Sequence, residues 1–562
     1  MIGNRSIVLV TSIGYFVGVT IFTLGSFGIV EVPGLTAVAL ALLLVPTLTF
    51  AFSERKRISE TMMLTSVLMP VLLVNYLYSL KMGYPVGFQD VHSHINEADS
   101  LLSGQGFIEF SKAQTVSFSF VGLYVVAWFL RAAAGIGIVA VASFLPPLVN
   151  LLVALFVYLV ARRIFDARIA SLTIILFAWD NATILFGHEF RTQTIGTLFT
   201  LGALLAYLGR RQVSARLGFA LTGILFLFAL STASFVSDIF ALVLFTVLAA
   251  TPIVVPKHRS LQRRSAQYGL FVAFSALYIL YVSTTTYGSP SAVVSSIVVL
   301  TREAFSASSV PTLEVGQEIY GPVVRAFTYF FWAIFGIFFI LLLRWRVIEQ
   351  HTVSLPILLG LMATFAAGVA FSTFSILSPG RAYAVGSILI AMVVAAGLVT
   401  LSKRTKVRLK KRVVALGSLF VAMFVVISVA KFPAYVIGDT APIRGHEIID
   451  DVPYWRLSAR DTSPADFLMR YGQGKQLHLD MLIAPFMILN LYEHGLEPAP
   501  STHDNLGRLV PSHIQVGDLI LLRNSYEDRQ YAFRNLLPSE AEYDRLALVY
   551  ADGDYDLFVV TS

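Results

Sequence analysis

The stretch 145–179, LPPLVNLLVALFVYLVARRIFDARIASLTIILFAW, decides the fold. It consists of an apolar run, a short basic turn with Arg162, Arg163 and Arg168, and a second apolar run. An apolar run of about 18 to 25 residues crosses the roughly 30 Å hydrocarbon core of a bilayer as an α-helix. The stretch therefore predicts two antiparallel membrane helices joined by a basic turn.

Similar apolar runs recur through the first 430 residues of a chain that is 56% hydrophobic and only 13% charged. We predict a polytopic α-helical membrane protein with about 13 transmembrane helices. The first run is interpreted as a helix rather than a signal peptide, because no small-residue cleavage site precedes the next run. The expected helices span 6–28, 33–52, 64–82, 137–161, 169–187, 194–208, 217–234, 237–255, 267–285, 323–343, 354–374, 383–401 and 413–430.

The charge of the chain divides it into two parts. Residues 1–438 hold 31 Lys and Arg against 15 Asp and Glu, and residues 439–562 hold 10 against 19. Basic clusters fall in alternate loops of the first part, which the positive-inside rule places in the cytoplasm. This pattern explains the basic charge without nucleic acid. It predicts a multi-pass protein of the plasma membrane with a cytoplasmic N-terminus and the acidic tail outside.

Two domains follow from this division. Residues 1–438 form the transmembrane domain, with outer loops at 83–136 and 286–322. Residues 439–562 are expected to form a soluble extracytoplasmic α+β domain, with strands in VGDLILLRNSY and a hairpin about Asp552-Gly553. The segment 116–134 is apolar, but counting it as a span would invert every later loop. It is therefore predicted to lie in the outer interface, with Tyr124 and Trp128 at that level.

A polar segment, GFQDVHSHINEADSLLSGQGF at 87–107, follows the third apolar run and lies at a membrane boundary. Ionisable groups at such a boundary are costly to desolvate, so the cluster is a functional-site hypothesis. It holds Asp90, His92, His94, Glu97 and Asp99. An ordinary solvated loop, with Asp90 as a helix N-cap, is the simpler alternative. Asp90, His92 and His94 could also hold a divalent cation, with sugar contact as the competing role.

Further ionisable residues from distant parts of the chain are predicted at the same membrane level: Asp180, His188, Glu189, Arg191, Asp238, Glu314, Glu318, Arg325 and Arg381. A carboxylate can take a proton from a hydroxyl, and arginines can stabilise a departing phosphate. Such a set suits transfer from an anionic lipid-linked donor. Glu189 and Arg191 could instead pair with lipid headgroups, and Arg381 could be an interfacial anchor.

The sequence resembles the GT-C superfamily of membrane glycosyltransferases. The aspartate-bearing first outer loop, the LLSGQGF turn at 101–107, the run 145–179, the polar turn HEFR at 188–191 and the closing LALVYADGDYDLFVVTS carry the resemblance. The chain departs from the family in its Asp-Val-His motif and in lacking a Trp-Trp-Asp triplet in the tail.

The resemblance implies an inverting transfer of sugar from a polyprenyl- or dolichyl-phosphate donor to a lipid- or protein-linked glycan, similar to archaeal mannosyl transfer to surface glycans. Asp90 would be the general base, Arg381 and Arg191 would hold the phosphate, and His92, His94, Glu97, His188, Glu189 and Arg325 would line the substrate site. The alternatives are a flippase or transporter of lipid-linked glycans and a glycan polymerase or ligase. A transporter is expected to carry ionisable groups at the midplane.

Overall fold

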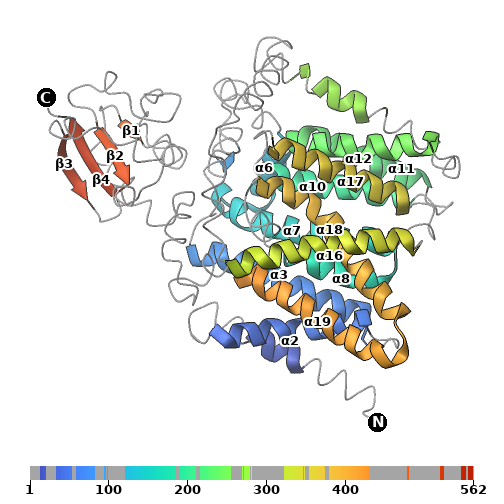
Figure 1. Ribbon diagram of the computed structural model, residues 1–562. Helices are drawn as coiled ribbons and strands as arrows, with labels where there is room; N and C mark the ends of the chain where they lie inside the picture. Colours follow the sequence, from blue (N-terminus) through green and yellow to red (C-terminus); the bar gives the residue numbers. More distant parts are fainter. Residues whose placement is uncertain are drawn as a thin grey trace.

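The structure is a computed structural model of the 562-residue chain. It describes residues 13–20, 33–52, 58–82, 94–95, 98, 121–180, 183, 190, 192–209, 216–254, 269, 271–278, 280–281, 322–345, 347, 354–373, 379–430, 477–479, 519–523, 546–551 and 555–560. Figure 1 shows the described part of the first 430 residues as a bundle of helices that run nearly parallel or antiparallel to one another.

Apolar helices make up this bundle. Their bounds are α2 (Pro33–Phe52), α3 (Glu60–Met82), α6 (Gly122–Ala134), α7 (Ile138–Ile164), α8 (Ala167–Ala178), α10 (Thr192–Gly209), α11 (Arg216–Ala233), α12 (Phe235–Val254), α16 (Pro322–Arg344), α17 (Ser354–Thr373), α18 (Pro379–Arg404) and α19 (Val407–Ala430). Within the described ranges, three stretches are long and apolar enough to cross a membrane: 140–164, 386–404 and 409–428.

The predicted helices agree with those observed, except at some ends. The helix predicted at 169–187 is α8, which already ends at Ala178, with Trp179 as its C-cap residue. The helix predicted at 64–82 begins earlier, at Glu60. Of the helices predicted at 6–28 and 267–285, the described parts at 13–20 and within 269–281 are helical. The apolar segment 291–306, which the sequence also predicts to lie in the outer interface, is outside the described residues.

The centre of the bundle is the contact between α8 and α18, which are far apart in the sequence. Every residue of α8 from Ile169 to Ala178 is buried, and so is every residue of α18 from 387 to 397 in the described burial pattern. Both helices are apolar around their whole circumference, as expected of helices surrounded by other helices. Helix α18 also packs against α16 and α17.

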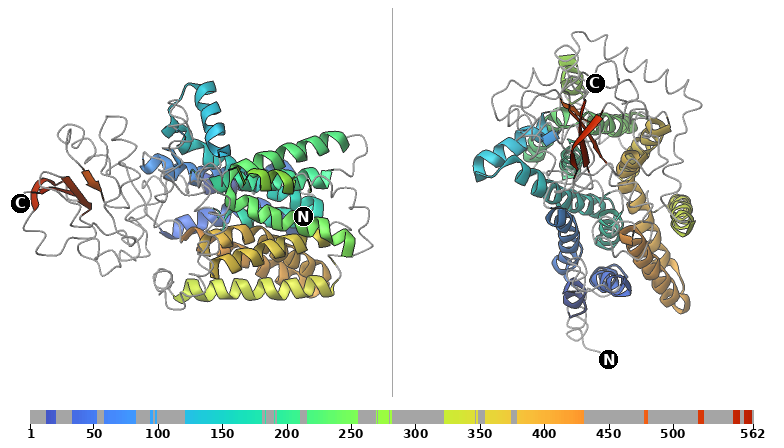
Figure 2. Two further views of the ribbon diagram at one scale, coloured as in Figure 1. Left: turned by 90° about the horizontal axis from the view of Figure 1, so that it is seen from above. Right: turned by 90° about the vertical axis from the view of Figure 1, so that its left-hand side faces the viewer.

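Helix α6 differs from the others in length and pattern. Its 13 residues measure about 20 Å at 1.5 Å per residue, too short to cross the hydrocarbon core. Leu123, Tyr124 and Ala127 are buried, whereas Trp128 and Phe129 are 46% and 62% exposed. In Figure 2 the cyan segment that contains α6 is inclined to the main helices. This geometry fits the predicted interfacial helix, but Tyr124 faces the protein rather than the interface.

The described strands near the C-terminus form a sheet of order β1-β2-β4-β3, with β1 (Leu477–Leu479), β2 (Leu519–Arg523), β3 (Leu546–Ala551) and β4 (Tyr555–Val560). Strands β3 and β4 pair antiparallel, as the predicted hairpin requires, and Asp552 and Gly553 between them lie outside the described residues. Strand β2 pairs antiparallel with β4 and parallel with β1. The sequence of the tail also predicts a helix that begins near Ser463 and ends near Gly472, and this segment lies outside the described residues.

Candidate functional site

One end of the bundle gathers the basic turns. Arg162 at the end of α7 forms an ion pair with Glu60 at the start of α3, with 2.9 Å between nitrogen and oxygen. Lys403 at the end of α18 pairs in the same way with Asp166 at 2.8 Å. The second contact brings together residues that are 237 positions apart in the chain. We call this end of the bundle the basic end.

The opposite end holds the part of the first outer loop that the structure describes. His94 and Ile95 are helical. The imidazole of His94 is 4% exposed, and its Nδ1 lies 2.7 Å from the Tyr124 hydroxyl of α6. A buried contact of this length between two polar groups anchors the loop to α6.

Tight packing fixes α6 at this end. A Cβ added to Gly122 would lie only 2.8 Å from the Cα of Ala233, the last residue of α11, so the two backbones touch. At its other end α6 stops at Gly135, whose φ of 67° is the left-handed conformation and whose N–H donates to the Arg131 carbonyl. Glycine adopts this conformation without a Cβ penalty. The Tyr124 hydroxyl therefore has a defined position.

Helices α10 and α12 meet closely at the same end. The Ser237 hydroxyl donates to the Gln193 carbonyl at 3.3 Å. A Cβ on Gly196 would lie 2.5 Å from the Ser237 Oγ and 2.9 Å from the Ser234 Cβ. Glycine at 196 is thus required by the close approach of the two helices.

A fully buried carboxyl group lies one residue further along α12. Asp238 is 0% exposed, and its Oδ1 accepts a hydrogen bond from the Ser275 hydroxyl at 2.9 Å. Its Oδ2 has no hydrogen-bond partner among the described atoms. Asp238 lies in the first turn of α12 and faces the interior of the bundle.

The structure locates only some of the predicted site residues. Asp90, His92, Glu97, His188, Glu189 and Arg191 lie outside the described residues. Arg325 and Arg381 lie in the first turns of α16 and α18. Both helices run toward the basic end. Arg325 and Arg381 therefore lie at the opposite end of the bundle, together with the described part of the first outer loop. Asp180 follows α8 there and is 4% exposed.

Metal binding is tested only in part. Among the described residues, no three His, Asp or Glu side chains are grouped as a metal site would need. Asp90 and His92, two of the three residues of the predicted alternative, are outside those residues. The third, His94, has its Nδ1 engaged with the Tyr124 hydroxyl.

Sequence reasoning missed Tyr124 and Ser275 as partners of the ionisable groups at this end. The signal for Tyr124 was present, because positions 123, 124 and 127 form one stripe at helical spacing, and a buried tyrosine hydroxyl needs a partner. No such signal marks Ser275. Its pairing with Asp238 depends on which two helices are neighbours, which a single sequence does not state.

Comparison with known proteins gives matches in structure only. No family model and no curated protein sequence matches the chain. ArnT from Cupriavidus metallidurans bound to undecaprenyl phosphate is similar with a TM-score of 0.49 and 14% identity, over 87% of this chain and 97% of that chain. The Archaeoglobus fulgidus oligosaccharyltransferase complex with Zn and sulfate has a TM-score of 0.43 and 12% identity, over 79% and 63%.

One of these proteins is bound to undecaprenyl phosphate, and the other is an oligosaccharyltransferase. At such scores and identities the likeness carries no conclusion about the reaction of this chain.

Proposed function

We propose that this chain is a membrane glycosyltransferase of the GT-C type, acting at the end of the bundle opposite the basic end. The observation that carries the proposal is the buried contact between His94 and Tyr124 at 2.7 Å. Asp90 precedes His94 by four residues, so its Cα lies within about 14 Å of this anchor. The acidic loop is therefore tied to the end at which Arg325 and Arg381 begin their helices.

Each charged residue has a role in the proposed reaction. Asp90 takes the proton from an acceptor hydroxyl, whose oxygen attacks the anomeric carbon of the donor sugar. The bond between that carbon and the phosphate oxygen breaks, and polyprenyl phosphate leaves with the bonding electrons, so the configuration inverts. Arg381, Arg191 and Arg325 offset the charge of this phosphate.

The remaining predicted residues shape the sugar site. His92, Glu97, His188 and Glu189 would contact the sugar hydroxyls, with Asp90 and His92 free to take a divalent cation if one is used. His94 is better suited to positioning the loop than to substrate contact, because it is buried against Tyr124. Dolichyl-phosphate mannose is the first donor to test, and a lipid-linked glycan is the first acceptor.

The distribution of buried charge supports surface chemistry over transport. Within the described part of the chain, the buried ionisable side chains His94, Asp180 and Asp238 all lie toward one end of the bundle. A transporter needs such groups near the midplane of the membrane.

The test is transfer of labelled sugar from polyprenyl-phosphate donors to glycolipid acceptors, in membranes that contain the wild type or Asp90→Asn. Loss of the general base is expected to lower transfer by about 10²-fold or more. Asp99→Asn makes the same chemical change in the same segment and is expected to keep transfer. Full transfer by Asp90→Asn would remove Asp90 from the mechanism. A wild type inactive with every donor, but active in lipid-glycan flipping, would replace the enzyme with a transporter.

A further inference from the structure

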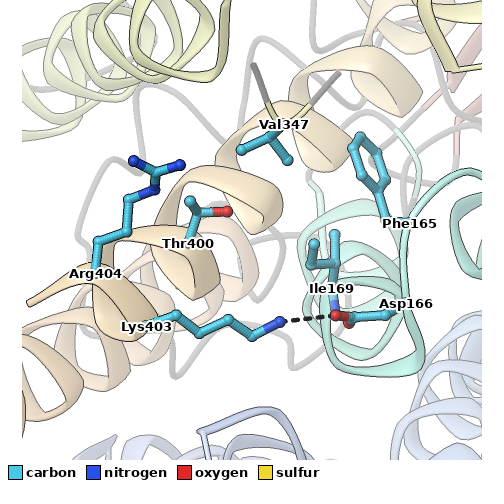
Figure 3. A pocket seen from close by; sticks show the side chains of 7 residues that line it. All are labelled: Phe165, Asp166, Ile169, Val347, Thr400, Lys403 and Arg404. Carbon is cyan, nitrogen blue, oxygen red and sulfur yellow. Dashed lines mark hydrogen bonds and ion pairs between the residues drawn. The ribbon is translucent and has the colours of Figure 1, made fainter. Parts of the chain in front are cut away.

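A cavity of about 210 Å³ opens at the basic end, between α8, α18 and the turn that follows α16. Figure 3 shows the side chains around it, with Lys403 reaching across to Asp166. The lining residues are Phe165, Asp166, Ile169, Val347, Thr400, Lys403 and Arg404. The cavity lies at the end of the bundle remote from the proposed reaction, and that reaction assigns it no role.

The polar wall of the cavity carries two cations and one carboxylate. Lys403 donates to the Asp166 Oδ2 at 2.8 Å, and Asp166 also accepts the backbone N–H groups of Arg168 and Ile169 at 2.9 Å each. Asp166 is thus the N-cap residue of α8 through its Oδ1, and it contacts Lys403 only through its Oδ2. Lys403 keeps the remaining donors of its ammonium group, since its side chain is 47% exposed.

Arg404 lies at the edge of the same cavity and is positioned by two contacts with Trp345. One guanidinium nitrogen donates to the Trp345 carbonyl at 3.1 Å, and the group lies 5.4 Å from the centre of the Trp345 ring. Tryptophan side chains are enriched at the level of lipid headgroups. An arginine that stacks on an aromatic ring keeps its other N–H groups as donors. Their planar arrangement matches the geometry of phosphate oxygens.

We propose that this cavity binds the phosphate group of an anionic phospholipid from the leaflet that the basic end faces. Basic pockets between membrane helices recognise such headgroups through charge and hydrogen bonds. Lys403 and Arg404 bind the phosphate oxygens, and Thr400 offers a hydroxyl between them. Asp166 holds Lys403 in position when the site is empty and competes with the phosphate for it.

A free phosphate compound would share this chemistry, but the rest of the lining favours a lipid. Phe165, Ile169 and Val347 form an apolar wall next to the charged one. A soluble phosphate gains nothing from such a wall, whereas the glycerol and first methylenes of a lipid bury apolar area against it.

The test is retention of phosphatidylglycerol by the purified full chain in native mass spectrometry, compared with phosphatidylcholine. Lys403→Gln with Arg404→Gln is expected to lower phosphatidylglycerol retention about tenfold. The matched control is Lys411→Gln with Arg412→Gln, which removes the same charge from exposed positions of α19 outside the cavity lining. The control is expected to lower retention only about twofold, through the general surface potential.

A third variant separates binding from folding. Asp166→Asn keeps an N-cap residue for α8 but removes the carboxylate that competes for Lys403, so it is expected to raise phosphatidylglycerol retention. A folding defect would lower it. Equal losses in the two double variants, or no preference over phosphatidylcholine, would overturn the proposal. Inorganic phosphate that stabilises the wild type but not the pocket variant, without any lipid preference, would reassign the cavity to a soluble phosphate compound.

Discussion

The two ends of the helical bundle are held together by different kinds of contact. At the basic end, charged side chains pair near the surface, and Lys403 and Asp166 are 47% and 44% exposed. At the opposite end, His94 and Asp238 are buried and bond to neutral hydroxyl groups. Exposed ion pairs are worth little and can exchange partners, whereas a buried polar contact is costly to break. The first arrangement suits binding at a surface, and the second suits a fixed site.

The largest effect is expected from a glycine-to-alanine substitution, made once at each end of the bundle. Gly196→Ala would force a methyl group against Ser237 and Ser234, and overpacking of this kind costs about 1–3 kcal/mol. Gly218→Ala lies at the start of α11, where nothing stands within 4 Å of the added Cβ, so it should stabilise by up to about 1 kcal/mol. Thermal unfolding in detergent measures both. Equal responses would mean that α10 and α12 are not tightly packed.

Two substitutions, one at each end, compare the stability contributed by a buried polar contact with that contributed by an exposed ion pair. Ser275→Ala takes away the hydrogen bond to the buried Asp238 Oδ1 and should lower the free energy of unfolding by about 1–3 kcal/mol. Lys403→Gln removes the exposed ion pair with Asp166 and should cost at most about 1 kcal/mol. Adding salt should weaken the Lys403 contribution but not that of Ser275. A larger loss from Lys403→Gln would reverse the contrast between the ends.

Tyr124→Phe tests whether the anchor of the first outer loop serves activity. Loss of the hydroxyl contact with His94 should cost about 1 kcal/mol in stability. Sugar transfer should fall further than the loss of folded protein explains, because the loop that carries Asp90 is less well positioned. Trp128→Phe, at an exposed position of the same helix, is the control and should leave transfer unchanged. Normal transfer by Tyr124→Phe would separate the anchor from the reaction.

The smallest effect concerns pH at the basic end. Burial raises the pKa of Asp166, but hydrogen bonds from Lys403, Ile169 and Arg168 and the charge of Lys403 outweigh it and hold this pKa below its ordinary value. The carboxylate therefore contributes stability above about pH 3.9, the usual aspartate pKa, and loses it as the pH falls through the lower folded value. Asp166→Asn should flatten this part of the acid unfolding curve. An unchanged curve would show that Asp166 is not involved.

The sequence predicted the helices well because hydrophobic length is a property of the chain itself. The run at 145–179 contains α7, α8 and the basic turn between them, and basic residues mark the ends of α7, α16 and α18. Helix ends were less predictable: α8 stops at Ala178, just before the polar pair Asp180 and Asn181, whereas the predicted helix continued through this pair to the apolar residues 184–186. The interfacial position of the segment 116–134 was predicted from loop charges, whereas the short length of α6, which begins only at Gly122, was not.

The candidate site was less predictable, because contacts between distant helices decide it. The sequence placed His94 and Asp238 at one membrane level but did not identify Tyr124 and Ser275 as their partners. The cavity at the basic end was also missed. Its basic residues were interpreted as markers of orientation, and nothing local indicates that Thr400, Lys403 and Arg404 face Phe165 and Ile169.

The central position of α18 has a consequence for how the protein is made. Helix α8 leaves the ribosome long before α18, the helix that later covers it. Meanwhile, its buried hydroxyls are already satisfied within the helix, because Ser171 donates to the Arg168 carbonyl and Thr173 to the Ile169 carbonyl. A helix whose polar groups are hydrogen-bonded internally can remain exposed to lipid at little cost in free energy. Membrane insertion and helix packing can therefore be separate steps. Helix α18 would pack last, against helices that entered the membrane before it.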